Sequence, residues 1–202
     1  MNTVTHSSPI AETAKSASPS LSARLAALPR DTRDTLFLLA VVAWILLPQI
    51  GNTPWWTSAL AASVLLWRAR LAVKAQPLPK RWVLAGLLIL AVAATWFSHR
   101  TLVGRDAGVT LIVLLLTLKT LEMRARRDAM VVFFLGFFTL LSNFFYSQSL
   151  LTALAMIVGL MGLLTALVNA HMTAGRPPLL QALRTAGLLV LWGTPVMIAL
   201  FL

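Results

Sequence analysis

Seven long apolar runs, separated by short polar connections, constrain this chain more than any other feature of its sequence. A helix that crosses the hydrocarbon core of a bilayer needs about 20 predominantly apolar residues, with a usable range of about 17–25. Several of the runs are short for this purpose, but their regular succession predicts an all-α fold. The fold class that we expect is a polytopic transmembrane helix bundle of about seven spans. The predicted spans are 35–50, 55–67, 82–97, 107–121, 130–146, 150–170 and 185–202.

The composition favours lipid as the solvent for most of the chain. Of the 202 residues, 58% are hydrophobic and only 11% are charged, against roughly 25% charged residues in soluble domains. The net charge of +11 could also indicate a nucleic-acid-binding protein. However, the basic residues stand in short clusters between the apolar runs. We therefore expect the lipid bilayer as a partner, and no nucleic acid.

The basic residues alternate between successive connections, and the positive-inside rule converts this asymmetry into an orientation. The N-terminal segment and the connections after the second, fourth and sixth runs hold most of the Lys and Arg residues. The other connections hold only Arg100 and Arg105. This pattern predicts a cytoplasmic N-terminus and, after an odd number of spans, an external C-terminus.

Three stretches need separate interpretation. The run 55–67 is the weakest, and it either crosses with the help of the apolar residues 71–73, thins the bilayer, or forms a re-entrant or interfacial piece. Residues 1–34 are Ser-, Thr-, Ala- and Pro-rich and then basic, which predicts a disordered or interfacial cytoplasmic tail before the membrane domain 35–202. The sequence stops at Leu202 within an apolar run. Either the last helix barely reaches the outer interface or the chain is a fragment, and we expect a fragment truncated before an external domain.

Charged residues gather at both ends of the fourth run. Asp106 precedes it, where a carboxylate can cap the following helix. Lys119 and Glu122 are three residues apart, so they share a helix face and can pair. About 24 Å of helix separates Asp106 from Glu122, so the two carboxylates cannot act on one substrate atom. We interpret these charges as structural. The alternative is a small transporter or channel component that uses Arg105, Asp106, Lys119 or Glu122 in a conducting path.

The sixth run carries small or weakly polar residues at alternating spacings of three and four. Such a face lets two helix backbones approach closely in lipid, so it predicts a packing surface, with a substrate groove as the alternative. The packing partner can lie within the chain or in a second copy, which would make a homo-oligomer. The residues of this face are Thr152, Ala155, Gly159, Gly162, Ala166 and Asn169.

No catalytic constellation is recognisable in the sequence. There is no cysteine, which excludes disulfides, thiolate metal sites and cysteine catalysis within these residues. The three histidines are far apart in the sequence, and no Gly-x-Ser-x-Gly, metalloprotease, phosphate-binding or dinucleotide motif occurs. We therefore assign no catalytic, metal-binding or cofactor-binding residue, and we expect no cofactor.

Several motifs resemble the N-terminal membrane region of the bacterial TgpA-type transglutaminase-like proteins, over a stretch from about Leu28 to Asn169. They are Trp67-Arg68, Gly-Arg-Asp-Ala-Gly at 104–108, Leu-Lys-x-Leu-Glu-x-Arg-x-x-Arg-Asp at 118–128, and Leu-Gly-Phe-Phe at 135–138 followed by Gln148-Ser149. The candidate family-motif or structural residues are Gly104, Arg105, Asp106, Gly108, Lys119, Glu122, Arg124, Arg127 and Asp128.

The resemblance implies a multi-helix anchor in the bacterial inner membrane, followed by an exported domain of transglutaminase fold and a final spanning helix. That external domain would carry a Cys-His-Asp triad and act as a cysteine acyltransferase or a protease-like enzyme. This chain would then be the anchor region of such an envelope protein. No member of the triad can be assigned here, because the sequence ends before the domain and contains no cysteine.

Overall fold

The computed structural model describes residues 29–201, with the exception of 102, 124–125 and 172–178. All regular structure in these ranges is helical, which confirms the prediction of an all-α fold. The long helices are α2 (Arg30–Leu46), α3 (Trp55–Val73), α4 (Arg81–His99), α5 (Arg105–Glu122), α6 (Arg126–Ser142), α7 (Leu150–His171) and α8 (Leu179–Phe201). Two short 3-10 helices, η1 (Leu47–Gln49) and η2 (Asn143–Phe145), follow α2 and α6.

Helix boundaries differ from the predicted spans by four to six residues at one or both ends of α2, α3, α6 and α8. The weak run 55–67 is the start of α3, a continuous helix of 19 residues, or about 28 Å. Helix α2 begins at Arg30, four residues before the end of the predicted tail 1–34. Residues 1–28 of that tail lie outside the described part of the chain.

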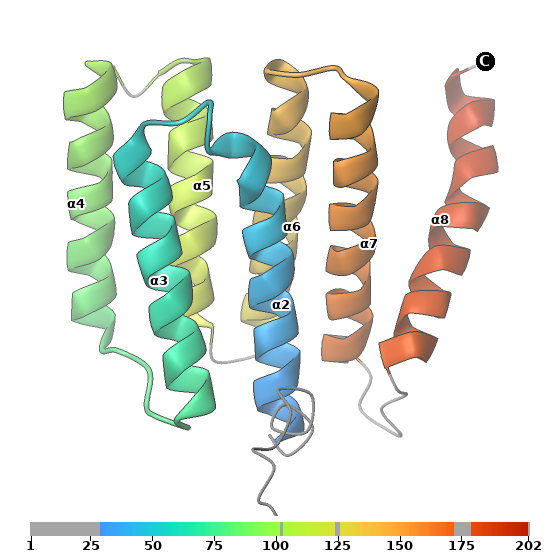
Figure 1. Ribbon diagram of the computed structural model, residues 1–202, viewed down its shortest axis with the longest axis horizontal. Coiled ribbons are helices and arrows are strands. Elements are labelled where there is room, and N and C mark those ends of the chain that lie inside the picture. The colour runs from blue at the N-terminus through green and yellow to red at the C-terminus, as the bar shows by residue number, and fades with distance from the viewer. Residues whose placement is uncertain (1–28, 102, 124–125, 172–178, 202) are drawn as a thin grey trace, which may run out of the picture.

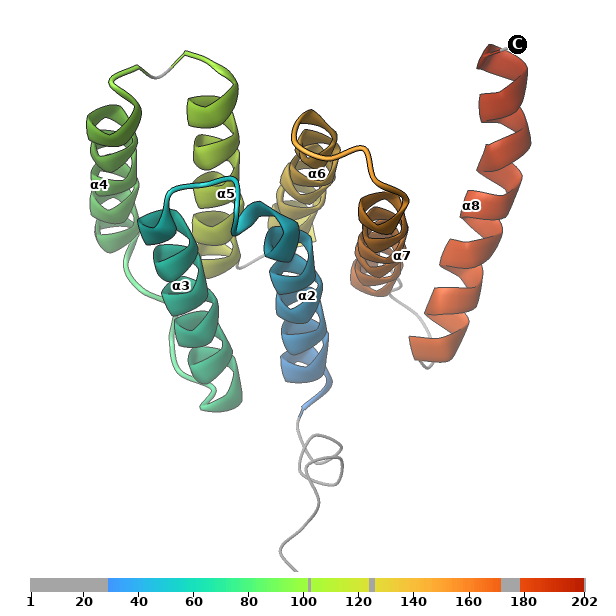
Figure 2. The same cartoon turned by 45° about the horizontal axis from the view of Figure 1, so that its top comes forward.

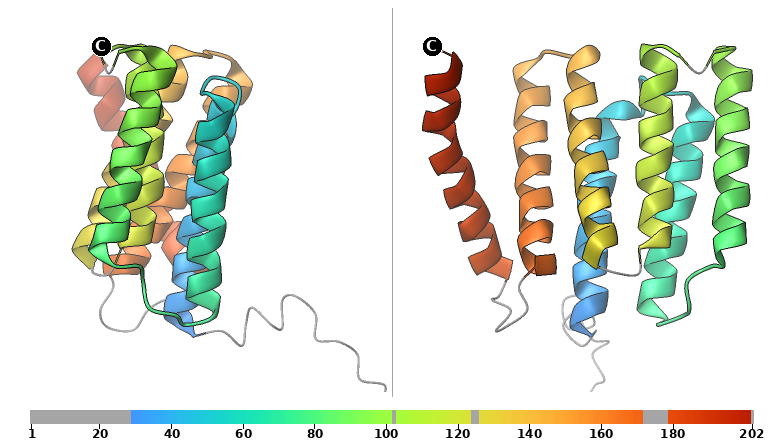
Figure 3. Two further views of the ribbon diagram at one scale, coloured as in Figure 1. Left: turned by 90° about the vertical axis from the view of Figure 1, so that its left-hand side faces the viewer. Right: turned by 180° about the vertical axis from the view of Figure 1, so that it is seen from behind.

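Successive helices run in opposite directions and form two layers (Figure 1). Helices α4 to α8 stand in a row in chain order, and α2 and α3 lie against one side of that row (Figures 2 and 3). Helix α3 packs on α5, and α2 packs on both α6 and α7, whereas α8 contacts the rest through α7. We call the end that holds the start of α2 and the α3–α4 connection the basic end. The end with the α2–α3, α4–α5 and α6–α7 connections is the opposite end.

Helix α5 lies at the centre and is buried along most of its length. Its polar groups are satisfied locally: the hydroxyls of Thr110 and Thr117 donate to backbone carbonyls four residues earlier, and that of Thr120 donates to one three residues earlier. Such back-bonding removes the cost of an unpaired buried hydroxyl. A central helix can therefore be more polar than its neighbours.

Three helical segments in the described ranges are long and apolar enough to cross a membrane: Arg81–His99, Asp128–Phe145 and Leu150–Ala170. A shorter apolar helical stretch covers Leu183–Gly193. Large apolar side chains stay exposed on the outer helices, such as Ile89 on α4, Phe138 on α6 and Trp192 on α8. An apolar surface this extensive is unusual for a protein surrounded by water.

Candidate functional site

The motif residues at the start of α5 meet Tyr146, which directly follows η2, in one polar cluster at the opposite end. The Tyr146 hydroxyl donates to Asp106 Oδ1 at 2.8 Å, and Arg105 Nε lies 3.3 Å from the same oxygen. The Arg105 guanidinium stacks 5.0 Å from the centre of the Tyr146 ring and also donates to the Phe145 carbonyl at 3.4 Å. We call Arg105, Asp106 and Tyr146 the Arg–Asp–Tyr cluster.

Gly104 begins α5 with an unusual backbone conformation, two residues before Asp106. Gly104 is the N-cap of α5 and has φ = 143°, a conformation that residues with a Cβ rarely adopt. No side chain caps this helix, so the predicted capping by Asp106 is not observed. The Asp106 carboxylate, in the first turn of the helix, instead accepts hydrogen bonds from Tyr146 and Arg105. Gly108 has open space around its Cα, since no atom lies within 4 Å of a Cβ built there.

The cluster shifts the ionisation of two of its members. The hydrogen bond from Tyr146, together with the hydrogen bond and charge of Arg105, lowers the pKa of Asp106 below its usual value. Burial, followed by the hydrogen bond to Asp106 and that residue's charge, raises the pKa of Tyr146 to about 12. At neutral pH the pair is therefore a carboxylate and a neutral phenol, held together by a charge-assisted hydrogen bond.

His99 and Asp106 have different hydrogen-bond partners. His99 Nε2 lies 3.2 Å from the Thr110 hydroxyl, one turn further along α5. The Thr110 hydroxyl donates its proton to the Asp106 carbonyl at 2.8 Å, so His99 does not activate it as a nucleophile. Among the described residues there is also no group of His, Asp and Glu that could hold a metal ion.

The second group of motif residues lies at the basic end. Lys119 Nζ is 2.9 Å from Glu122 Oε2, as the spacing of three suggested, and 3.9 Å from Asp128 Oδ1 at the start of α6. Lys119 thus bridges the last turn of α5 and the first turn of α6. Arg124 lies outside the described residues, and for Arg127 only its place in helix α6 is described.

The small-residue face of α7 is in contact with α2 and α6. A Cβ built on Gly162 would lie 2.8 Å from Val41 Cγ2, and one on Gly159 would lie 3.0 Å from Leu140 Cδ2. The carbonyl of Ala155 accepts a hydrogen bond from Trp44 Nε1 at 3.0 Å. The face thus has its partner within the chain, and Ala166 lines a cavity beside α2. A homo-oligomer formed through this helix stays a prediction.

Two buried polar groups escaped the sequence reasoning. Arg68 was taken as a residue of the connection after the second run, but it lies within α3 and is only 8% exposed. Its Nε donates to the Thr120 carbonyl of α5 at 3.1 Å. Gln49, in η1, is buried and donates to the Ser142 hydroxyl at 3.0 Å. The motif Trp67-Arg68 was the one feature of the sequence that pointed to Arg68, and no feature pointed to Gln49.

Comparison with known proteins identifies the family. The sequence model described as TgpA N-terminal domain matches residues 37–202. The chain belongs to the TgpA N-terminal domain family. This match confirms the resemblance drawn from the motifs, all of which lie within the matched range.

A curated relative of this TgpA N-terminal domain is a protein-glutamine gamma-glutamyltransferase from Pseudomonas aeruginosa (strain PAO1). The two are 35% identical over 176 residues, which make up 87% of this chain and 26% of the relative. The chain thus spans about a quarter of the length of the curated relative that it matches. No solved structure matches the chain.

Proposed function

We propose that this chain is the membrane anchor of a transglutaminase-like envelope protein in the bacterial inner membrane. In this proposal all seven long helices span, the basic end faces the cytoplasm, and the end of α8 faces the periplasm. The catalytic domain lies beyond residue 202. Residues 1–202 contribute no catalytic group, since a thiolate nucleophile needs a cysteine and the chain has none.

The observation that carries this proposal is the gathering of basic side chains at one end of the bundle. The basic end holds, at helix ends and in the α3–α4 connection, residues Arg70, Lys74, Lys80, Arg81 and Lys119. At the opposite end, the described connections and helix termini hold Arg100 and Arg105, and Arg105 is paired with Asp106. An excess of Lys and Arg in the short connections of one side favours a cytoplasmic location of that side.

The relative supports the second half of the proposal. Its printed name is a glutamyltransferase, and 74% of its length falls outside the match, since the match covers 26%. The unmatched part of the relative is long enough to hold a separate catalytic region. Tethering such a region at the membrane raises its effective concentration near envelope substrates. The Arg–Asp–Tyr cluster, exposed at the end that would face the periplasm, is the surface that we expect to contact it.

The topology is tested by reporter fusions that are active on one side of the membrane. A cytoplasmic reporter should be active after every fusion point at the basic end, and a periplasmic reporter after every point at the opposite end. A cytoplasmic signal after Leu202 would remove the basis for an exported catalytic domain. The fusion points are Arg81, Arg127 and Arg184 for the basic end, and Gly51, Gly104 and Leu202 for the opposite end.

The division of labour is tested by comparing three proteins: the full-length protein, residues 1–202 alone, and the remainder without residues 1–202. Acyl transfer from a glutamine substrate should occur with the first and the third, and not with residues 1–202 alone. Turnover of any glutamine or peptide substrate by residues 1–202 would refute the anchor assignment.

A further inference from the structure

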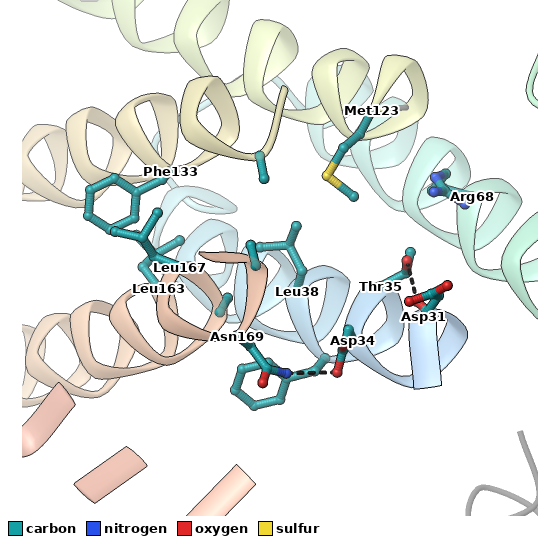
Figure 4. Close-up of a pocket in the computed structure, with 14 residues that line it drawn as sticks. Asp31, Asp34, Thr35, Leu38, Arg68, Met123, Phe133, Leu163, Leu167 and Asn169 are labelled. Carbon is teal, nitrogen blue, oxygen red and sulfur yellow. Dashed lines mark hydrogen bonds between the residues drawn. The ribbon is translucent and has the colours of Figure 1, made fainter. Parts of the chain in front are cut away.

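A cavity of about 340 Å³ lies at the basic end between α2, α3, α5, α6 and α7 (Figure 4). Its size falls within the range of about 300–1,000 Å³ that ligand pockets occupy. One part of its wall is polar, with Arg68, Asp31 and Asp34. The rest is mostly apolar and is made by Phe37, Leu38, Met123, Ala129, Phe133, Leu163, Ala166, Leu167 and Ala170.

Arg68 is the unusual member of this wall. Its side chain comes from α3 and is more than nine-tenths buried, yet it makes one hydrogen bond, from Nε to the Thr120 carbonyl. The two Nη nitrogens have no protein acceptor and no ion-pair partner among the described residues. The Nη atoms are not among the buried polar atoms that lack a partner, so solvent reaches them. Because Arg68 lines the cavity, these donors are available there to an anion.

The two carboxylates in the wall are engaged elsewhere. Asp34 Oδ1 accepts a hydrogen bond from Asn169 Nδ2 at 2.7 Å (Figure 4), and both Asp31 and Asp34 have further partners. Neither forms an ion pair with Arg68. Both carboxylates thus have other partners, and neither takes up the Nη groups of the guanidinium.

We propose that this cavity binds the phosphate group of a membrane phospholipid. The planar guanidinium presents its two Nη groups in the geometry that grips two oxygens of one phosphate. The apolar wall formed by Leu38, Phe133 and Leu163 then receives the first part of an acyl chain. Basic residues on the same end of the bundle attract anionic headgroups to that level of the membrane. A free phosphate ion would use the guanidinium but would leave the apolar wall uncovered.

The test uses the full chain, delipidated in detergent and titrated with phosphatidylglycerol, with the bound fraction read by native mass spectrometry. Arg68→Gln should weaken binding about tenfold to a hundredfold, which is the loss expected for a charge-assisted hydrogen bond. Arg100→Gln is the matched control, because it makes the same charge change at an exposed position of the opposite end, away from the cavity. Its affinity should stay within about twofold of the original.

A second variant keeps the test valid if Arg68→Gln fails to fold. Ala129→Leu fills the apolar part of the cavity without touching the guanidinium and should also weaken lipid binding, whereas Ala85→Leu, on the exposed side of α4, should not. Diacylglycerol, which lacks the phosphate, should bind more weakly than phosphatidylglycerol. Equal binding of the two lipids, unchanged binding by Ala129→Leu, or displacement of the lipid by inorganic phosphate at similar concentration would each overturn the proposal.

Discussion

Replacing Gly162 by alanine tests how closely α2 and α7 pack. The added Cβ would lie 2.8 Å from Val41 Cγ2 and 3.0 Å from Val41 Cγ1, well inside the 3.5–4.0 Å at which carbon atoms attract. Val41 is 8% exposed, and a valine in a helix has one strongly preferred χ1 rotamer. Its methyl groups therefore cannot rotate away, and the two helices must separate.

The expected change in the free energy of unfolding is the sum of two opposing contributions. Overpacking of this kind costs about 1–3 kcal/mol, while exchanging glycine for alanine within a helix contributes up to about 1 kcal/mol of stability. Gly86 in α4 provides the control, since no atom lies within 4 Å of a Cβ built there and only the second term operates. The free energy of unfolding of Gly162→Ala should therefore be about 1–3 kcal/mol lower than that of Gly86→Ala.

Thermal unfolding of the purified chain in one detergent measures this difference. Each kcal/mol corresponds to about 2–4 °C for a chain of this size, so Gly162→Ala should melt at least about 2 °C below Gly86→Ala. Adding Val41→Ala to Gly162→Ala removes the clashing methyl groups, so the double variant should lose less stability than the two single changes together. Equal melting temperatures for Gly162→Ala and Gly86→Ala, with no coupling to Val41, would refute the close approach of α2 and α7.

Three further predictions concern polar contacts. Tyr146, the single tyrosine of the chain, should ionise near pH 12 in an absorbance titration and closer to pH 10 in Asp106→Asn. The contribution of Tyr146 to the free energy of unfolding should accordingly be complete below about pH 10 and lost as the pH rises through about 12. The contribution of Asp106 should be present above about pH 4 and lost as the pH falls through its lowered pKa. Titration of Tyr146 near pH 10 in the unchanged chain would contradict the hydrogen bond on which both expectations depend. Ser142→Ala should cost about 1–3 kcal/mol in thermal unfolding, because it removes the acceptor of Gln49, whose Oε1 already lacks a partner; no change would mean that this hydrogen bond does not form. Glu122→Gln should alter stability by less than about 1 kcal/mol, and the unchanged chain should pass no ions in liposomes; ion flux that disappears in Glu122→Gln would favour the transporter alternative.

The existence and order of the helices could be predicted because each depends on a local run of apolar residues. For the end of α3 the sequence left alternatives open, and continuation through the apolar residues 71–73 agrees with the observed end at Val73. The sequence could not show how Arg68 is accommodated inside this helix. Arg68 Nε donates to the Thr120 carbonyl of α5, which offsets part of the cost of a buried charge. A hydropathy scale gives each residue type one transfer free energy, and it takes no account of a hydrogen-bond partner on another helix.

The same distinction separates the predictable from the unpredictable polar contacts. The Lys119–Glu122 pair follows from a spacing of three on one helix. The contact between Asp106 and Tyr146 spans 40 residues and depends on how α5 and α6 pack. The small-residue face of α7 was visible in the sequence, but its partner α2 was not. Small residues indicate that another helix packs closely against them, and they do not indicate which helix this is.

The placement of charge along α5 bears on the choice between anchor and transporter. This helix is central and buried, so a conducting path through the bundle would need its polar side chains to face a water-filled space. Its charged residues, however, lie in its first turn and near its last turn, and each of them is paired. Between them, the hydroxyls of Thr110 and Thr117 donate to carbonyls of α5 itself, which leaves these donors no proton for a transported ion or solute. The charges and the hydroxyl donors of α5 are thus satisfied within the protein. This favours the proposed anchor over the transporter alternative, which needs such groups to face a water-filled path.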